Sequence, residues 1–142
     1  MGGVTMDLAT FGAIMSFGLD LEQQAAAFYE IAARGALEES FANLAKSARK
    51  RAVRMERTRR EGIAEMILEP ITGMDGDDYH LELTPDADEA ELLRQAIALE
   101  ETTQGFYMDA AGKIPIKEVV RTCIRMAQES ERRRAELEKL QP

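Results

Sequence analysis

The stretch LEQQAAAFYEIAAR, residues 21–34, returns seventy-eight residues later as LEETTQGFYMDAAG, residues 99–112. Both copies begin with Leu-Glu, place Phe-Tyr six residues after the Glu and continue to Ala-Ala. Apolar residues in and around each copy recur at intervals of three and four, which is the spacing of a helix with one buried face. The repeat therefore predicts two equivalent helices, each carrying a glutamate, Glu22 or Glu100, next to its apolar face.

Glycines and prolines divide the chain into four predicted helices. Gly35 follows the first helix closely, as a glycine at the end of a helix commonly does. Thr84 is the expected N-cap of the third helix, with Pro85 in its first turn. The expected ranges of the helices are about 7–33, 37–68, 85–111 and 115–140.

The lengths of the connections predict how the helices are arranged. Short turns join the helices within each half, so hairpin 1 (residues 7–68) and hairpin 2 (residues 85–140) are each antiparallel pairs. The segment 69–84 can extend over about 50 Å, while a helix of 26 residues is about 39 Å long. We therefore expect an all-α, ferritin-like four-helix bundle, with a long crossover between two similar hairpins, in a single domain spanning residues 1–142.

The net charge of −8 is unevenly distributed. Residues 46–60 contain eight basic side chains and one acidic one, whereas residues 75–101 contain ten acidic side chains and one arginine. The acidic balance argues against nucleic-acid binding. The two oppositely charged stretches are expected to be solvated helix faces that attract each other or a second subunit, and a homodimer is the favoured assembly.

Other features of composition indicate the compartment. No apolar run approaches the length of about 18–20 residues that spans a bilayer, and the N-terminus lacks a basic region followed by an apolar stretch. The single cysteine, Cys123, cannot form an internal disulfide, and this suits a reducing environment. We expect a cytoplasmic protein without a membrane segment.

The sequence resembles the rubrerythrin-like branch of the ferritin-like superfamily. The resemblance covers most of residues 10–140 and is most specific in the third helix. Proteins of that family hold a pair of iron or manganese ions at the bundle centre. Each hairpin supplies one Glu from its first helix and a Glu-x-x-His from its second. The residues that carry the resemblance are DLEQQAAAFYEIAA (20–33), LLRQAIALEETTQGFYMDAAGKI (92–114) and VVRTCIRMAQESERRRAEL (119–137).

The family's ligand pattern is only half present. The glutamates of the first helices match at Glu22 and Glu100. The Glu-x-x-His positions of the second helices are instead occupied by Ala48 and Arg51 in hairpin 1, and by Ser130 and Arg133 in hairpin 2. Arginine carries donors only and stays protonated, so it cannot ligate a cation. The resemblance therefore implies a degenerate two-metal site with no bound cofactor.

The same change from His to Arg in both halves leads to a hypothesis. Arg51 is expected to pair with Glu22, and Arg133 with Glu100, so that two guanidinium groups replace the metals. The fork of an arginine can engage a carboxylate through two hydrogen bonds. This favours a structural, oligomeric or binding role over an enzymatic one.

Three alternatives remain open at this stage. The arginines could belong to the solvated basic face. If the predicted fourth helix (115–140) is rotated, Glu131 or Glu129 could join Glu22 and Glu100 in a carboxylate-only site for iron or manganese. The protein would then be a metal-dependent oxidoreductase. A small anionic ligand could also bridge Arg51 and Arg133.

The remaining reactive side chains have simpler explanations. Tyr29 and Tyr107 lie seven residues after Glu22 and Glu100, and so share their helix faces. They are expected to fill the core, with hydroxyl groups able to reach the central charges. Cys123 is expected to be a buried, inert thiol. No catalytic nucleophile pair, phosphate loop or metal motif is visible.

Overall fold

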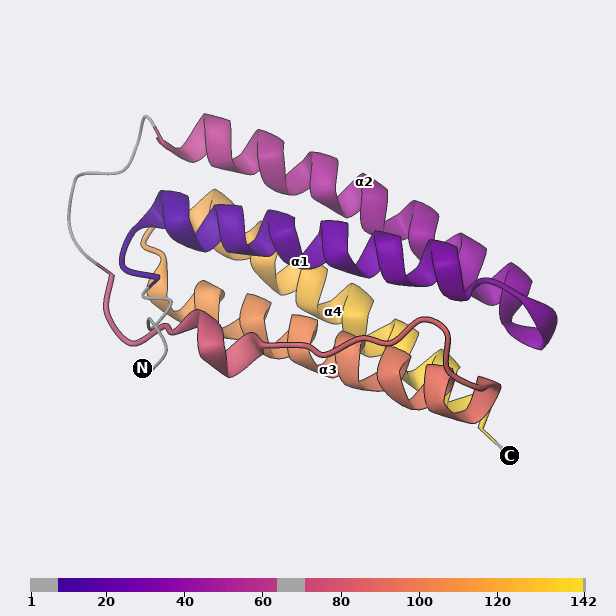
Figure 1. The fold of residues 1–142 in the computed structure, drawn as a ribbon. Coiled ribbons are helices and arrows are strands. Elements are labelled where there is room, and N and C mark those ends of the chain that lie inside the picture. Colours follow the sequence, from indigo (N-terminus) through magenta and orange to yellow (C-terminus); the bar gives the residue numbers. More distant parts are fainter. Residues whose placement is uncertain (1–7, 64–70, 142) are drawn as a thin grey trace.

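The computed structural model of the protein describes residues 8–63 and 71–141. Figure 1 shows that α1 and α2 are antiparallel, that α3 and α4 are antiparallel, and that the segment from residue 71 to the start of α3 runs along the length of the bundle. The expected all-α bundle of two hairpins is therefore confirmed. Within these residues, the long helices are α1 (Phe11–Ala32), α2 (Glu38–Ile63), α3 (Glu89–Lys113) and α4 (Lys117–Lys139).

The helix starts differ from those predicted. Asp88, rather than Thr84, caps α3, because its side chain accepts a hydrogen bond from the Glu91 amide at 2.9 Å. Thr84 instead belongs to the crossover, where its amide donates to the side chain of Gln95 at 2.7 Å. Thr10 caps α1 by accepting from the Ala13 amide at 3.0 Å. The predicted start of the first helix at residue 7 and the predicted end of the second at 68 lie outside the described residues.

The crossover is fixed to the bundle by side chains. Tyr79, in a short 3-10 turn (Gly76–Tyr79), donates its hydroxyl to Asp109 on α3. Gln24 on α1 donates to the carbonyl of Leu81 at 3.4 Å. Arg34, just after α1, donates to the carbonyls of Pro85 and Ala87 at 2.8 and 2.9 Å. These bonds hold the chain against both α1 and α3, and thereby set the register of hairpin 2 against hairpin 1.

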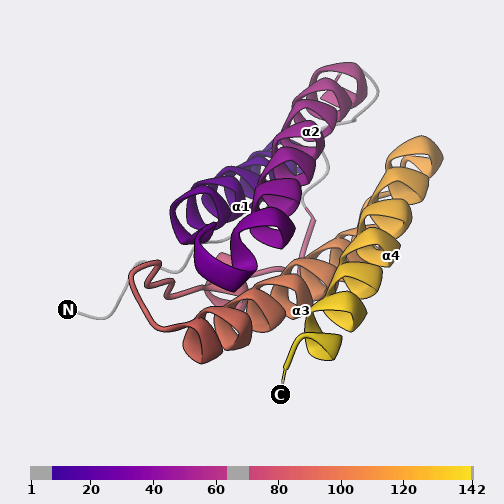
Figure 2. The same cartoon turned by 90° about the vertical axis from the view of Figure 1, so that its right-hand side faces the viewer.

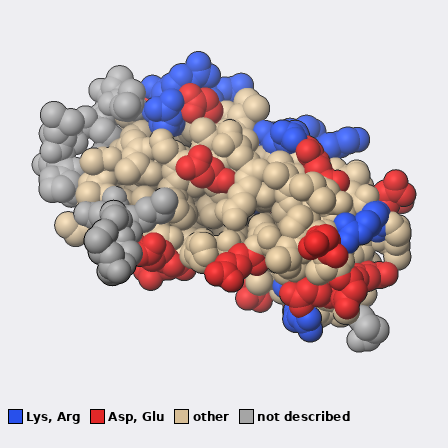
Figure 3. All heavy atoms as spheres, in the orientation of Figure 1, with Lys and Arg blue, Asp and Glu red and all other residues tan. Residues whose placement is uncertain are grey.

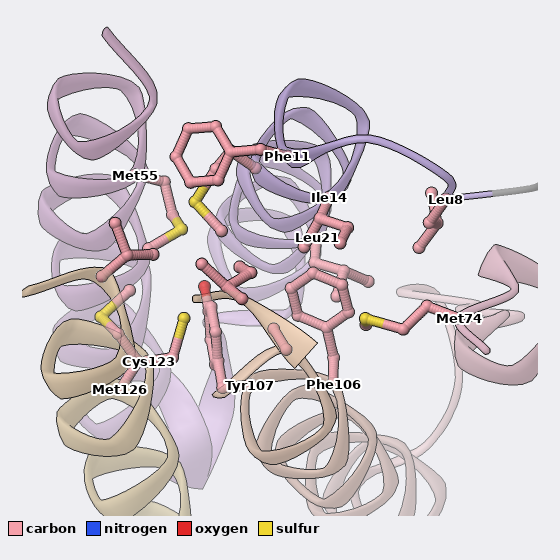
Figure 4. Close-up of a cluster of buried hydrophobic side chains, with 14 of the residues drawn as sticks. Leu8, Phe11, Ile14, Leu21, Met55, Met74, Phe106, Tyr107, Cys123 and Met126 are labelled. Carbon is pink, nitrogen blue, oxygen red and sulfur yellow. The ribbon is translucent and has the colours of Figure 1, made fainter. Parts of the chain in front are cut away.

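The two hairpins form two layers, seen end-on in Figure 2. Two apolar clusters fill the space between them. The first surrounds Phe106 and Tyr107 and includes the sulfur-bearing side chains of Met55, Cys123 and Met126 (Figure 4). The second surrounds Tyr29 and contains mostly alanine and leucine.

A buried polar layer separates these clusters along every helix. On α1, for example, Glu22 follows Leu21 of the first cluster and precedes Ala25 of the second. Arg51, Glu100 and Ser130 occupy the same intermediate position on α2, α3 and α4. These four residues are 0–3% exposed. The sequence thus directs one polar residue from each helix into the middle of the bundle.

Candidate functional site at the centre of the bundle

Glu22 and Glu100 are joined to the opposite hairpin by tyrosines. Tyr107 on α3 donates its hydroxyl to Glu22 Oε2 at 2.6 Å. Tyr29 on α1 donates to Glu100 Oε2 at the same distance. Because α1 and α3 are antiparallel and each tyrosine lies two turns beyond its own glutamate, every glutamate is level with the other helix's tyrosine. The repeat therefore creates two reciprocal cross-links between the hairpins.

Arg51 on α2 lies between the two glutamates. Its Nε donates to Glu22 Oε1 at 3.1 Å, and this confirms the expected contact between Arg51 and Glu22. Its Nη2 lies 3.7 Å from Glu100 Oε1 and donates to Ser130 Oγ at 3.2 Å. One guanidinium thus contacts α1, α3 and α4 from α2. The interpretation of Arg51 as part of a solvated basic face is wrong, because the residue is 3% exposed.

The expected pair between Glu100 and Arg133 is not formed. Arg133 makes no ion pair within 4.0 Å with any described residue, and its Nη2 donates to Ser47 Oγ on α2 at 2.6 Å. The physical reason is that Arg51 already lies against Glu100, so a second guanidinium there would meet a like charge. The internal symmetry of the sequence is therefore broken at this one position.

Arg51 and Arg133 nevertheless form a second reciprocal set of cross-links. Arg51 reaches from α2 to Ser130 on α4, and Arg133 reaches from α4 to Ser47 on α2. Sequence reasoning missed Ser47, since a serine four residues before an arginine carries no distinctive signal. These four hydrogen bonds, two between α1 and α3 and two between α2 and α4, connect the hairpins reciprocally through the polar layer.

The structure also fixes the register of α4. Glu131 is exposed and so cannot join Glu22 and Glu100, which removes it from the carboxylate-only alternative. Glu129 instead turns inward and lies 4.0 Å from Arg51 Nη1. It also pairs with Arg54 at 3.4 Å and Arg125 at 3.6 Å, so three arginines surround its carboxylate.

Burial and charge shift the pKa values of the central groups. Burial raises the pKa of Glu100, and the charge of Arg51 and the hydrogen bond from Tyr29 oppose this only in part. Burial alone would lower the pKa of Arg51, but the charges of Glu22 and Glu100 raise it above its usual value. Burial, followed by the adjacent carboxylates, raises the pKa of both Tyr29 and Tyr107. The phenols are therefore hydrogen-bond donors at neutral pH.

The side chains present do not fit a two-metal centre. Such a centre needs four carboxylates and two imidazoles, whereas the positions that the family resemblance assigns to these ligands provide Glu22 and Glu100 only. Ala48 and Ser130 carry no charge, and the cation Arg51 lies between the two carboxylates. In the described ranges no three His, Cys, Asp or Glu side chains are grouped as metal ligands.

The other reactive groups lie apart from this centre. Cys123 is fully buried in the first apolar cluster, and burial raises the pKa of its thiol to about 12. That thiol is therefore protonated and unreactive at neutral pH. His80 is exposed on the crossover, 3.6 Å from Glu82.

None of the helices in the described residues is long and apolar enough to cross a membrane.

The fold and the glutamate-centred polar layer define a four-helix bundle of the ferritin type, and comparison with known proteins agrees. The family model of the ferritin-like domain matches residues 12–140. This chain belongs to the ferritin-like domain family. Among solved structures, it is similar to a Thermotoga maritima protein provisionally named a ferritin-like diiron-carboxylate protein. That match has a TM-score of 0.77 and 15% identity, covering 97% of this chain and 96% of the other. The comparison with curated proteins found no match.

Proposed function

We propose that this protein is a ferritin-like bundle in which an arginine-centred ion-pair network stands where relatives hold metals, and that it acts as a structural or binding protein. The observation that carries this proposal is the guanidinium of Arg51, a residue that is only 3% exposed. It lies 3.1 Å from Glu22 and 3.7 Å from Glu100. A fixed positive charge between two carboxylates opposes the binding of a cation there and supplies the charge balance that the cation would provide.

The centre then holds the hairpins together instead of performing redox chemistry. Each central hydrogen bond joins residues of different helices, and both tyrosine–glutamate bonds join hairpin 1 to hairpin 2. Buried polar networks of this kind fix one arrangement of helices, because a misaligned network leaves charges unpaired. We also propose that the chain is related to the rubrerythrin-like branch of the family. A cytoplasmic location is proposed as well, since it suits a protein with one cysteine.

Metal analysis of the purified protein tests the proposal. The chain is expressed in medium supplemented with iron and manganese, incubated anaerobically with Fe²⁺ or Mn²⁺, desalted and measured by mass spectrometry of the elements. We expect much less than one metal ion per chain. About two ions per chain, the content of a two-metal centre, would overturn the proposal.

A matched variant shows that the measurement can detect a restored site. The fourfold change A48E, R51H, S130E and R133H rebuilds the ligand pattern of the family at the same positions. We expect this variant to take up metal under the conditions in which the unmodified chain does not. Circular dichroism establishes that both proteins are helical before the metal contents are compared.

Self-association is proposed as the way in which the surface acts. In Figure 3 most basic atoms lie along the upper edge, over α2, and many acidic atoms lie along the lower part. The exposed bases of α2 include Lys46, Lys50 and Arg57, and the exposed acids of the crossover include Asp77 and Glu82. In a two-fold dimer, α2 of each copy can meet the crossover of the other, so that the contact is made twice.

Sedimentation tests this dimer. We expect a dimer at low ionic strength that dissociates as salt rises, because contacts between surface charges are screened beyond about 8–10 Å at physiological salt. The charge reversal K50E on α2 should dissociate the dimer at low salt, and D77K on the crossover should restore association when added to it. A monomer at every protein and salt concentration would contradict this proposal without affecting the one about the centre.

A further inference from the structure

Arg133 lines a pocket of about 280 Å³ between the first turns of α2 and the last turns of α4. This pocket lies to one side of the buried centre, between α2 and α4. Its polar side chains come mostly from α2, and its apolar wall comes from both helices. The residues that the argument uses are Ser40, Asn43, Leu44, Ser47, Arg133 and Leu137.

Arg133 makes no direct ion pair in this pocket. Within the described residues no carboxylate lies within 4.0 Å of its nitrogens. Its Nη1 is buried and makes no hydrogen bond to any described residue. Burial, followed by the charge of Arg51, lowers the pKa of Arg133, and the charges of Glu100, Glu129 and Glu22 oppose this only in part. A partly buried guanidinium with no carboxylate in direct contact is costly, and a bound anion in contact with it reduces that cost.

The rest of the pocket indicates which anion would fit. Ser40 and Asn43, one turn apart on α2, add donors to the lining of the pocket, and Ser47 already accepts from Arg133. Leu44 and Leu137 form an apolar side. A guanidinium N–H forms a charge-assisted hydrogen bond to a carboxylate oxygen, and an apolar wall gains free energy by burying hydrocarbon.

The size of the pocket and the charge at its rim further restrict the class of ligand that would fit. A volume of about 280 Å³ lies just below the range of about 300–1,000 Å³ typical of sites for larger ligands. Glu136 also lines the pocket and is exposed, so a second negative charge on the ligand would meet a like charge. Both features favour a small, singly charged ligand.

We infer that this pocket binds a small monocarboxylate with a short apolar tail, whose carboxylate is held by Arg133 and whose tail lies against Leu44 and Leu137. This inference goes beyond the proposed function, and it does not depend on the metal content of the centre. The carboxylate supplies the direct ion pair that Arg133 lacks, while Arg51 retains Glu22.

Calorimetric titration with sodium hexanoate tests the inference. We expect hexanoate to bind one site per chain, and R133Q to weaken binding by about tenfold or more, because hydrogen bonds to charged groups are the stronger kind. R132Q is the matched control, since Arg132 is the exposed neighbour on the same helix. It should bind hexanoate as the unmodified protein does. Equal binding by R133Q, or no binding by the unmodified protein, would overturn the inference.

Two further comparisons test the same inference and do not depend on whether R133Q folds. Glu136→Gln removes the like charge at the rim and should strengthen hexanoate binding by about two- to fivefold, the range of exposed charge interactions. Hexanol and inorganic phosphate, tested on the unmodified chain, should each bind much more weakly than hexanoate. If Glu136→Gln weakened binding, or if hexanol or phosphate bound as well as hexanoate, the assignment of the ligand class would be wrong.

Discussion

Arg51 Nε lies 3.1 Å from Glu22 Oε1 in the middle of the bundle, and the two side chains are 4% and 0% exposed. This contact joins α2 to α1, and the rest of the same guanidinium faces Glu100 and Ser130 on α3 and α4. A single arginine thereby connects all four helices at the middle of the bundle.

Removal of this arginine should be severely destabilising. Arg51→Ala leaves Glu22 and Glu100 buried without their cation, and we expect a loss of about 3–5 kcal/mol in the free energy of unfolding. The double variant Arg51→Ala with Glu22→Ala should lose less than the sum of the two single variants, because the pair is coupled. Urea denaturation of the four proteins measures that coupling.

A control on the same helix separates this effect from a general loss of positive charge. Arg57 is exposed on α2, and Arg57→Ala should change the free energy of unfolding by no more than about 0.5 kcal/mol. Additive effects of the substitutions at Arg51 and Glu22 would show that the two residues are not energetically paired.

The two tyrosine–glutamate hydrogen bonds should contribute unequally to the free energy of unfolding. Tyr29→Phe and Tyr107→Phe each remove one hydrogen bond to a buried carboxylate, with an expected cost of about 1–3 kcal/mol. The cost should be greater for Tyr29→Phe, since Glu100 accepts from no other described side chain, whereas Glu22 also accepts from Arg51. Chemical denaturation at neutral pH ranks the variants, and a loss below about 0.3 kcal/mol for both would contradict the role of these bonds.

The raised pKa of Glu100 predicts a specific dependence of stability on pH. The pKa of Glu100 is higher in the folded protein than its ordinary value of 4.5. Between pH 4.5 and the raised pKa, the folded state therefore binds more protons than the unfolded state does. The contribution of Glu100 to stability is therefore fully present below about pH 4.5 and is lost as pH rises through the raised pKa. Glu100→Gln should become more stable relative to the unmodified protein as pH increases.

Denaturation curves between about pH 5 and 8 measure this difference, because other titrating groups largely cancel between the two proteins. Glu101→Gln is a matched control, since Glu101 is the exposed neighbour on α3. Its stability difference from the unmodified protein should stay nearly constant with pH. A constant difference for Glu100→Gln as well would show that the folded state does not raise this pKa.

Two glycines in helices should respond oppositely to alanine. A methyl group at Gly62 would lie 2.5 Å from the buried ring of Phe11, so Gly62→Ala should cost about 1–3 kcal/mol through overpacking. At Gly105 on α3 a methyl group meets nothing within 4 Å among the described residues. Gly105→Ala should therefore stabilise the helix by up to about 1 kcal/mol. Thermal unfolding compares the two, and a stabilised Gly62→Ala would contradict the packing at Phe11.

The sequence allowed both the class of fold and half of the centre to be predicted. Helical spacing, the repeated Leu-Glu and Phe-Tyr stretches, and one long connection define the hairpins and place Glu22 and Glu100 on their buried faces. The start of α3 was misplaced because Thr84 and Asp88 are both good N-caps. The choice between them depends on the contact of Thr84 with Gln95, which is made only in the folded chain.

The partners of the central arginines depended on tertiary structure. The sequence by itself determined that Arg51 and Arg133 hold equivalent positions in two similar hairpins. It carried no information on which one enters the centre, because one guanidinium can serve two carboxylates and a second would meet a like charge. Packing of the four helices places Arg51 inside and turns Arg133 towards Ser47, since only the assembled bundle brings those charges together.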